Sequence, residues 1–159
     1  MIALAIEELH RSENDLAVEL LQVAARHETE HGVFHLACDL AAWSQRHVSE
    51  LAEAGRDFGL DLDPEPKAPS GIATAVREKG AELLGRRPEP ALLLLADLRR
   101  VHRMAAGTSL DWEVLAQTAQ AIQAKELLAL TKRCHPETLR QLRWSNATVK
   151  ELAAQALTS

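Results

Sequence analysis

Residues 2–27 of this chain read IALAIEELHRSENDLAVELLQVAARH. Apolar side chains recur in this stretch at steps of three and four residues, which is the period of one face of an α-helix. The stripe consists of Ile6, Leu9, Glu13, Leu16, Leu20, Val23 and His27. Glu13 is the only ionisable residue inside this stripe, and His27 stands at the end of the stripe. The pattern predicts an amphipathic helix over residues 2–27 with a carboxylate on its apolar face.

Ser12 allows a second interpretation of the same stretch. Serine favours the N-cap position, so a helix could instead begin at Glu13, which would then face solvent near the break. The apolar pattern continues through Ser12 without interruption. We therefore expect one unbroken helix with Glu13 directed inward.

Three further segments show the helical period, over residues 30–57, 91–124 and 125–156. Gly59 follows the first of them in the place where a glycine commonly ends a helix. Alanine and leucine, both strong helix formers, dominate the chain, and runs of β-branched residues are few. The sequence therefore predicts an all-α protein with four long helices.

Residues 58–90 differ in composition from the rest of the chain. Five of its six prolines lie here, at positions 64, 66, 69, 88 and 90. Ser70 could cap a short helix over residues 71–84. A connection of this length between helices two and three must run along the bundle, which makes those two helices parallel. We expect a single domain over residues 1–159, a four-helix bundle with a long crossover that contains a short helix.

Bulk composition restricts the class of function. The chain has 159 residues, 47% hydrophobic and 26% charged, with a formal net charge of −5. It has no basic stripe with interleaved aromatic residues, so nucleic-acid binding is not expected. Its N-terminal apolar run is too short for a signal peptide or a membrane span, which predicts a cytoplasmic protein without membrane contact. Cys38 and Cys134 lie roughly 15 Å apart in depth, too far for a disulfide.

Polar side chains interrupt the apolar stripe of all four predicted helices at one depth. They are Glu13, His47, Asp111 and His135, each about ten to thirteen residues from the same end of the bundle. Burial of such groups among aliphatic side chains costs free energy unless they pair or bind a metal ion. The sequence therefore predicts a polar site inside the bundle, to which all four helices contribute.

This arrangement resembles the ferritin-like superfamily over nearly the whole chain. That family takes one carboxylate from each of two helices and a Glu-x-x-His pair from each of the other two, which together bind two iron ions. Glu13 and Asp111 match the two lone carboxylates. His47 matches one imidazole, although Ser44 stands where the family has glutamate. The resemblance implies dimerisation through helix faces.

The fourth helix departs further from the family pattern. It carries Glu137-x-x-Arg140, with arginine in the place of histidine. An inward Arg140 would supply the positive charge that iron supplies in the family, by pairing with Glu13 or Asp111. We therefore expect no iron pair. We expect a single iron, manganese or zinc ion, or else a metal-free bundle that acts in protein–protein interaction or dimerisation. The expected ligands are Glu13, His47, Asp111 and His135, with Ser44, Glu137 and Arg140 around them.

Several of these residues have simpler interpretations. His47 could be a core histidine that donates to Ser44 or to a backbone carbonyl group. Thr108-x-x-Asp111 follows Gly107 and has the spacing of a capping box, which would break the third helix and make Asp111 a cap. Pro136 could interrupt the fourth helix beside His135. The bundle would then consist of five or six shorter helices.

A second group of histidines lies near the end of the first helix. His27, His31 and His35 are spaced by four, which on one continuous helix would form a metal-binding stripe. Gly32 and the nearby glutamates indicate a turn instead. We expect these three histidines to be solvated.

Overall fold

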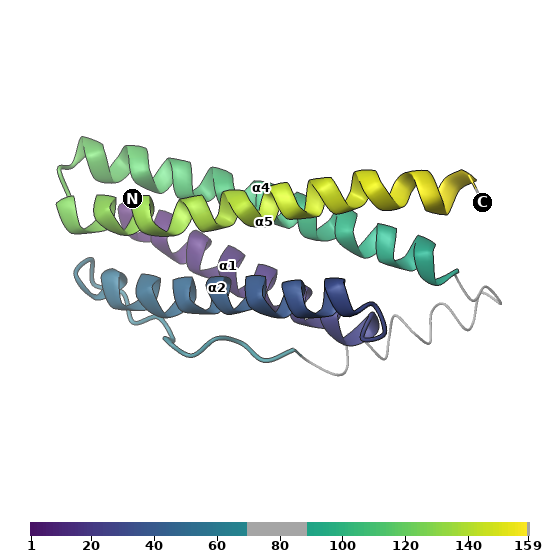
Figure 1. Cartoon of the computed structure of the whole chain (residues 1–159). Helices are drawn as coiled ribbons and strands as arrows, with labels where there is room; N and C mark the ends of the chain where they lie inside the picture. Colours follow the sequence, from purple (N-terminus) through teal and green to yellow (C-terminus); the bar gives the residue numbers. More distant parts are fainter. Residues whose placement is uncertain (70–88, 159) are drawn as a thin grey trace.

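The computed structural model describes residues 1–69 and 89–158, and in these ranges the chain forms four helices and no strand (Figure 1). They are α1 (Ile2–Arg26), α2 (His31–Arg56), α4 (Pro90–Ala121) and α5 (Lys125–Thr158). The predicted all-α class is confirmed. The short helix predicted over residues 71–84 lies outside the described residues.

The helices form two antiparallel hairpins, α1–α2 and α4–α5, that lie side by side (Figure 1). Within each hairpin the helices pack closely, and α1 of the first hairpin packs on α4 of the second. Among the neighbouring pairs, α2 and α5 approach each other least. Figure 1 shows α2 and α4 running in the same direction, as the long connection between them requires.

The connection after α2 begins with a tight reversal at Gly59. This residue has a φ of +78°, a conformation that glycine adopts without strain. The backbone N–H of Leu60 donates to the carbonyl oxygen of Gly55 at 3.0 Å. A Cβ atom on Gly55 would lie only 3.2 Å from the Cβ of Leu60, so glycine permits the close approach. The helix stop predicted at Gly59 is confirmed.

The chain then runs back along the first hairpin (Figure 1). The Nε2 of His10 donates to the carbonyl oxygen of Asp63 at 2.9 Å. One turn further along α1, the Oδ1 of Asn14 accepts a hydrogen bond from the N–H of Lys67 at 3.0 Å. Polar side chains on the outer part of α1 thus satisfy the backbone of this irregular segment.

None of the breaks considered above occurs, because α1, α4 and α5 are each continuous. The Oγ1 of Thr108 donates to the carbonyl oxygen of Met104 at 2.9 Å, a bond that satisfies its hydroxyl inside a helix and leaves no capping box. Pro136 lies within α5 on its exposed side. The interpretation of five or six shorter helices is therefore wrong.

Two apolar clusters occupy opposite ends of the bundle. One cluster includes Ile6, Leu9, Leu51, Trp112 and Leu115, and the other includes Leu16, Leu20, Leu40, Val101 and Ala105. Full burial of one such large side chain stabilises the fold by roughly 1.5–3 kcal/mol. The polar residues described below lie between the two clusters, at the centre of the molecule. Within the described ranges, no helix combines the length and the apolar character needed to cross a bilayer.

Candidate functional site: a buried polar layer

Glu13 lies at the centre of the bundle and has no exposed surface. Its Oε1 accepts hydrogen bonds from the Nδ1 of His47 at 2.8 Å and from the Nε1 of Trp112 at 2.7 Å. The Oγ1 of Thr138 approaches the same oxygen at 3.4 Å. The other carboxylate oxygen, Oε2, has no hydrogen-bond partner in the described part of the chain. Side chains from all four helices thus meet at a single carboxylate.

His47 connects this carboxylate to the surface. Its ring has no exposed area and packs edge-to-face against Trp112, with centroids 5.6 Å apart. Its Nε2 lies 3.3 Å from the Oε1 of Glu137, which is 18% exposed. The Nη2 of Arg46 donates to both carboxylate oxygens of Glu137, at 2.6 Å to Oε2. The row Glu13–His47–Glu137–Arg46 alternates acid and base from the core outward.

The charges in this row shift one another's pKa values. Burial disfavours the protonated imidazole of His47, but hydrogen bonds and negative charge from Glu13 and Glu137 outweigh burial and raise its pKa. Burial also opposes ionisation of Glu137, but Arg46 and His47 outweigh that effect and lower the pKa of Glu137. The pKa of Arg46 is raised, chiefly by its hydrogen bond to Glu137. In this row Glu137 and Arg46 each favour the charged form of the other, and the two carboxylates beside His47 favour its protonated form.

This arrangement predicts a pH-dependent stability. A raised pKa of His47 stabilises the fold fully below its ordinary value of 6.5, and the stabilisation is lost as pH rises through the raised value. The lowered pKa of Glu137 acts oppositely, since its contribution is present above 4.5 and lost as pH falls through the lowered value. Denaturant unfolding at a series of pH values should show wild type losing stability above pH 6.5 relative to His47→Gln.

The variant His35→Gln is the matched control, because His35 is exposed. It should keep the pH profile of the wild type. A difference between wild type and His47→Gln that stays constant above pH 6.5 would contradict the assignment of a charged imidazole to position 47.

A second polar contact joins α2 and α5, about one helical turn away from His47 and Thr138. Gln141, fully buried on α5, donates from Nε2 to the Oγ of Ser44 and to the carbonyl oxygen of Leu40, both at 2.9 Å. Its Oε1 has no hydrogen-bond partner within the described residues. Ser44 thus pairs with Gln141 and does not bond to His47.

The structure brings only two of the four predicted ligands together. Glu13 and His47 are in contact, as the depth comparison predicted. Asp111 instead accepts a hydrogen bond from the Oγ of Ser12 at 2.7 Å. His135 bonds through Nε2 to the Oγ of Ser109 at 2.8 Å. Both are half-buried, on the outer side of the polar layer.

Of the residues predicted to surround the ligands, one lies in the polar layer and another does not. Glu137 joins the polar layer, whereas Arg140 is exposed. Arg46, which the sequence analysis did not consider, provides the cation opposite Glu137. Within residues 1–69 and 89–158, no three His, Cys, Asp or Glu side chains are grouped so that they could hold a metal ion. The four predicted ligands are therefore not brought together in the described residues, and the binding of a single metal ion stays a prediction.

Trp112 and Thr138 complete the layer, and neither was among the predicted site residues. Each lies close in sequence to a predicted residue, Trp112 directly after Asp111 and Thr138 directly after Glu137. A signal for Trp112 exists in the spacing of the buried residues of α4, which are Val101, Ala105, Thr108, Trp112, Leu115 and Ala119. This stripe has the regular four-three alternation of a bundle seam.

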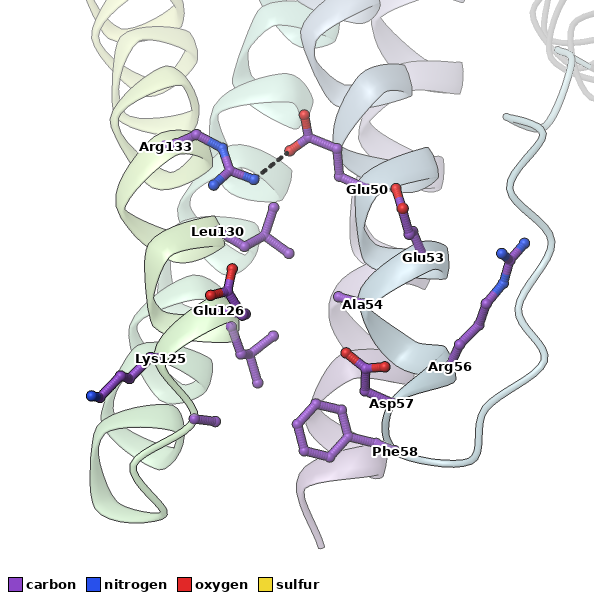
Figure 2. Close-up of a pocket in the computed structure, with 12 residues that line it drawn as sticks. Glu50, Glu53, Ala54, Arg56, Asp57, Phe58, Lys125, Glu126, Leu130 and Arg133 are labelled. Carbon is purple, nitrogen blue, oxygen red and sulfur yellow. Dashed lines mark ion pairs between the residues drawn. The ribbon is translucent and has the colours of Figure 1, made fainter.

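A cleft of about 740 Å³ opens between α2 and α5, at the end that holds the C-terminus of α2 (Figure 2). Ala54, Phe58, Leu127 and Leu130 provide its apolar surface. Figure 2 shows Arg133 of α5 reaching across towards Glu50 of α2, with 3.8 Å between the charged groups.

Cys134 on α5 is hydrogen-bonded to Glu50, one of the residues that line this cleft. Its thiol donates to the Oε2 of Glu50 at 3.2 Å. Burial, reinforced by Glu50, raises the pKa of the thiol well above its usual range. The thiol therefore stays protonated at neutral pH and lacks the thiolate of a catalytic cysteine. Cys38 and Cys134 are both free, as predicted.

A separate buried ion cluster ties the end of α1 to α4. Asp97 accepts two hydrogen bonds from Arg26, both at 3.0 Å, and its Oδ2 lies 2.8 Å from the Nε2 of His27. The three side chains are between 6% and 9% exposed. The prediction that His27 is solvated is wrong because Asp97 pairs with it, whereas His31 and His35 are exposed as predicted.

The layer contains a buried carboxylate and an imidazole that lies between two carboxylates, one of which reaches solvent. Compared with protein-family models, with curated proteins and with solved structures, the chain finds no match.

Proposed function

We propose that this chain is a ferritin-like helical bundle that works through protein–protein contacts and needs no metal ion in its core. The two hairpins and the long connection between them support the ferritin-like part of the proposal. The claim that the core needs no metal ion depends on which side chains provide positive charge to the buried carboxylates.

The observation that carries the proposal is the alternation of acidic and basic side chains in the hydrogen-bonded row Glu13–His47–Glu137–Arg46. In a metal-binding bundle, carboxylates inside the core require cations from outside the chain. Here the imidazolium of His47 and the guanidinium of Arg46 provide that positive charge from α2. Both ring nitrogens of His47 already face carboxylates. A metal ligand must offer a free lone pair, and protonation of this ring, which both carboxylates favour, removes that lone pair.

Surface features support action through protein contacts. Leu110 and Val114 are 59% and 49% exposed and lie one turn apart on α4. Adjacent exposed apolar residues on a helix are typical of a contact surface, whereas isolated ones are common on any protein.

Elemental analysis of protein purified without a histidine tag tests the proposal. We expect substoichiometric iron, manganese and zinc, and an unfolding temperature that chelators leave unchanged. The matched variant is Glu13→Gln, which keeps the shape of the side chain while removing its charge. Stoichiometric metal in the wild type, lost in this variant, would overturn the proposal.

That outcome would favour a second candidate function, the binding of a single metal ion at the core. The unpartnered Oε2 of Glu13 supports this candidate, since a buried carboxylate oxygen without a donor is unusual. Under this candidate, His47 would have to release a proton to coordinate, and metal uptake would rise with pH.

A further inference from the structure

One face of α4 is exposed along most of the length of the helix, and we call it the α4 stripe. Its members are Ala96, Arg99, Arg103, Ala106, Gly107, Leu110, Glu113, Val114 and Gln117. They are spaced by three and four residues, the pattern with which one helix packs along another. The stripe thus has the periodicity of a helix interface without a partner helix among the described residues.

We propose that two copies of this chain dimerise through the α4 stripe, packed antiparallel about a two-fold axis at the level of Thr108. This inference rests on the proposed function, because it identifies the protein partner as a second copy. In an antiparallel two-fold pair, a residue that lies a given number of positions before Thr108 in one copy faces the residue that lies the same number of positions after Thr108 in the other copy. The register can therefore be checked against the chemistry of each facing pair.

The centre of the stripe is complementary in shape. Leu110 lies two positions after the axis, and Ala106 lies two positions before it. The leucine of one copy thus packs over the small Ala106 and Gly107 of the other. A Cβ atom on Gly107 would meet nothing within 4 Å in the single chain, so this space is open to a partner.

The flanks of the stripe are complementary in charge and polarity. Arg103 lies five positions before the axis and faces Glu113, five positions after it. Arg99 and Gln117, each nine positions away, also face each other. Symmetry repeats both pairs. A parallel arrangement would instead place arginine against arginine and glutamate against glutamate, so charge selects the antiparallel one.

Room for the longer side chains lies beside the stripe. A shallow depression on the surface is lined by Leu110, Val114, Gln117 and His135. Val114 lies six positions after the axis, next to the place of the partner's Arg103. The aliphatic part of that arginine can cover Val114 while its guanidinium group reaches Glu113.

Sedimentation velocity of the full chain, over concentrations from about 1 μM to about 1 mM, tests this dimer. Leu110→Asp should raise the dissociation constant at least about a hundredfold, since two leucines lose their contacts. Arg103→Glu and Glu113→Arg should each raise it about tenfold by opposing like charges. The double variant Arg103→Glu/Glu113→Arg should restore the wild-type value.

Two further variants control for general effects. Leu157→Asp alters a leucine at the far end of α5 that is at least as exposed as Leu110, and it should leave the dissociation constant unchanged. Gly107→Leu adds a side chain into space that is open in the single chain, so it should preserve the helical circular dichroism spectrum while preventing dimerisation.

The inference is overturned if the wild type is monomeric throughout the range, or if it dimerises and the double charge variant does not recover what the single variants lose. Either result leaves the metal analysis unaffected. Stoichiometric metal would overturn the proposed function and would not change the register test, so the two failures are distinguishable.

Discussion

Glu13→Ala is expected to lower the free energy of unfolding by about 3–5 kcal/mol, the usual cost of removing one partner from a buried ion pair. The substitution leaves the charged ring of His47 without its nearest anion. It also removes the acceptor of the Trp112 indole N–H, and an unsatisfied buried donor costs roughly 1–3 kcal/mol by itself. Urea unfolding monitored by Trp fluorescence and circular dichroism measures the loss.

Two variants separate the charge from the cavity in this experiment. Glu13→Gln keeps an oxygen acceptor for Trp112 but removes the charge, so its loss should be smaller than that of alanine. The double variant Glu13→Leu/His47→Leu replaces the pair by apolar groups and should recover more than half of the loss, because such replacements are often nearly neutral. A cost for Glu13→Ala below about 1 kcal/mol, typical of surface positions, would show that the pair is not buried.

The second large effect is expected at Asp97, which lies against the C-terminal end of α1. Asp97→Ala should lower the free energy of unfolding by about 3 kcal/mol or more. It leaves the guanidinium of Arg26 and the ring of His27 buried without the carboxylate that binds both. Chemical denaturation of purified protein provides the value.

The exposed pair Arg11–Glu8 is the matched control for Asp97. Removal of Glu8 should have no measurable effect on stability, because solvent screens a surface ion pair. Asp97→Asn should lie between wild type and Asp97→Ala, since the amide retains an acceptor oxygen. Equal stabilities for Asp97→Ala and Glu8→Ala would exclude a structural role for the cluster.

The sequence predicted the depth of the polar layer along the helices better than it predicted which side of each helix faces inward. Counting along helices placed Glu13 and His47 at one level, and the structure brings them into contact. On α4 the count reached the right turn, but Trp112 and not Asp111 points inward. One residue corresponds to a rotation of about 100° around a helix, and a count of helical rise does not resolve it.

The orientation of α5 could not be obtained from apolar periodicity. Its inward side carries Thr131, Cys134, Thr138, Gln141 and Ser145, all buried and mostly polar. A search for leucines instead selects residues such as Leu128, Leu139 and Leu142, which are only half-buried. The inward polarity of α5 matches Ser44 and His47 on α2, so it follows from a tertiary pairing that a single-helix pattern does not contain.

The turn near His27 shows another such case. The sequence correctly predicted a turn there, which leaves His31 and His35 exposed. The burial of His27 depends on Asp97, seventy positions further along the chain. No local pattern indicates a partner at that separation.

The half-buried position of Glu137 determines how quickly the interior can exchange protons. The ring of His47 has no contact with water, yet its Nε2 is one hydrogen bond, 3.3 Å, from a carboxylate that reaches solvent. A proton can leave the imidazole along this path while the bundle stays folded. We therefore expect ionisation of the central histidine to be limited by a local side-chain movement and not by global opening of the helices.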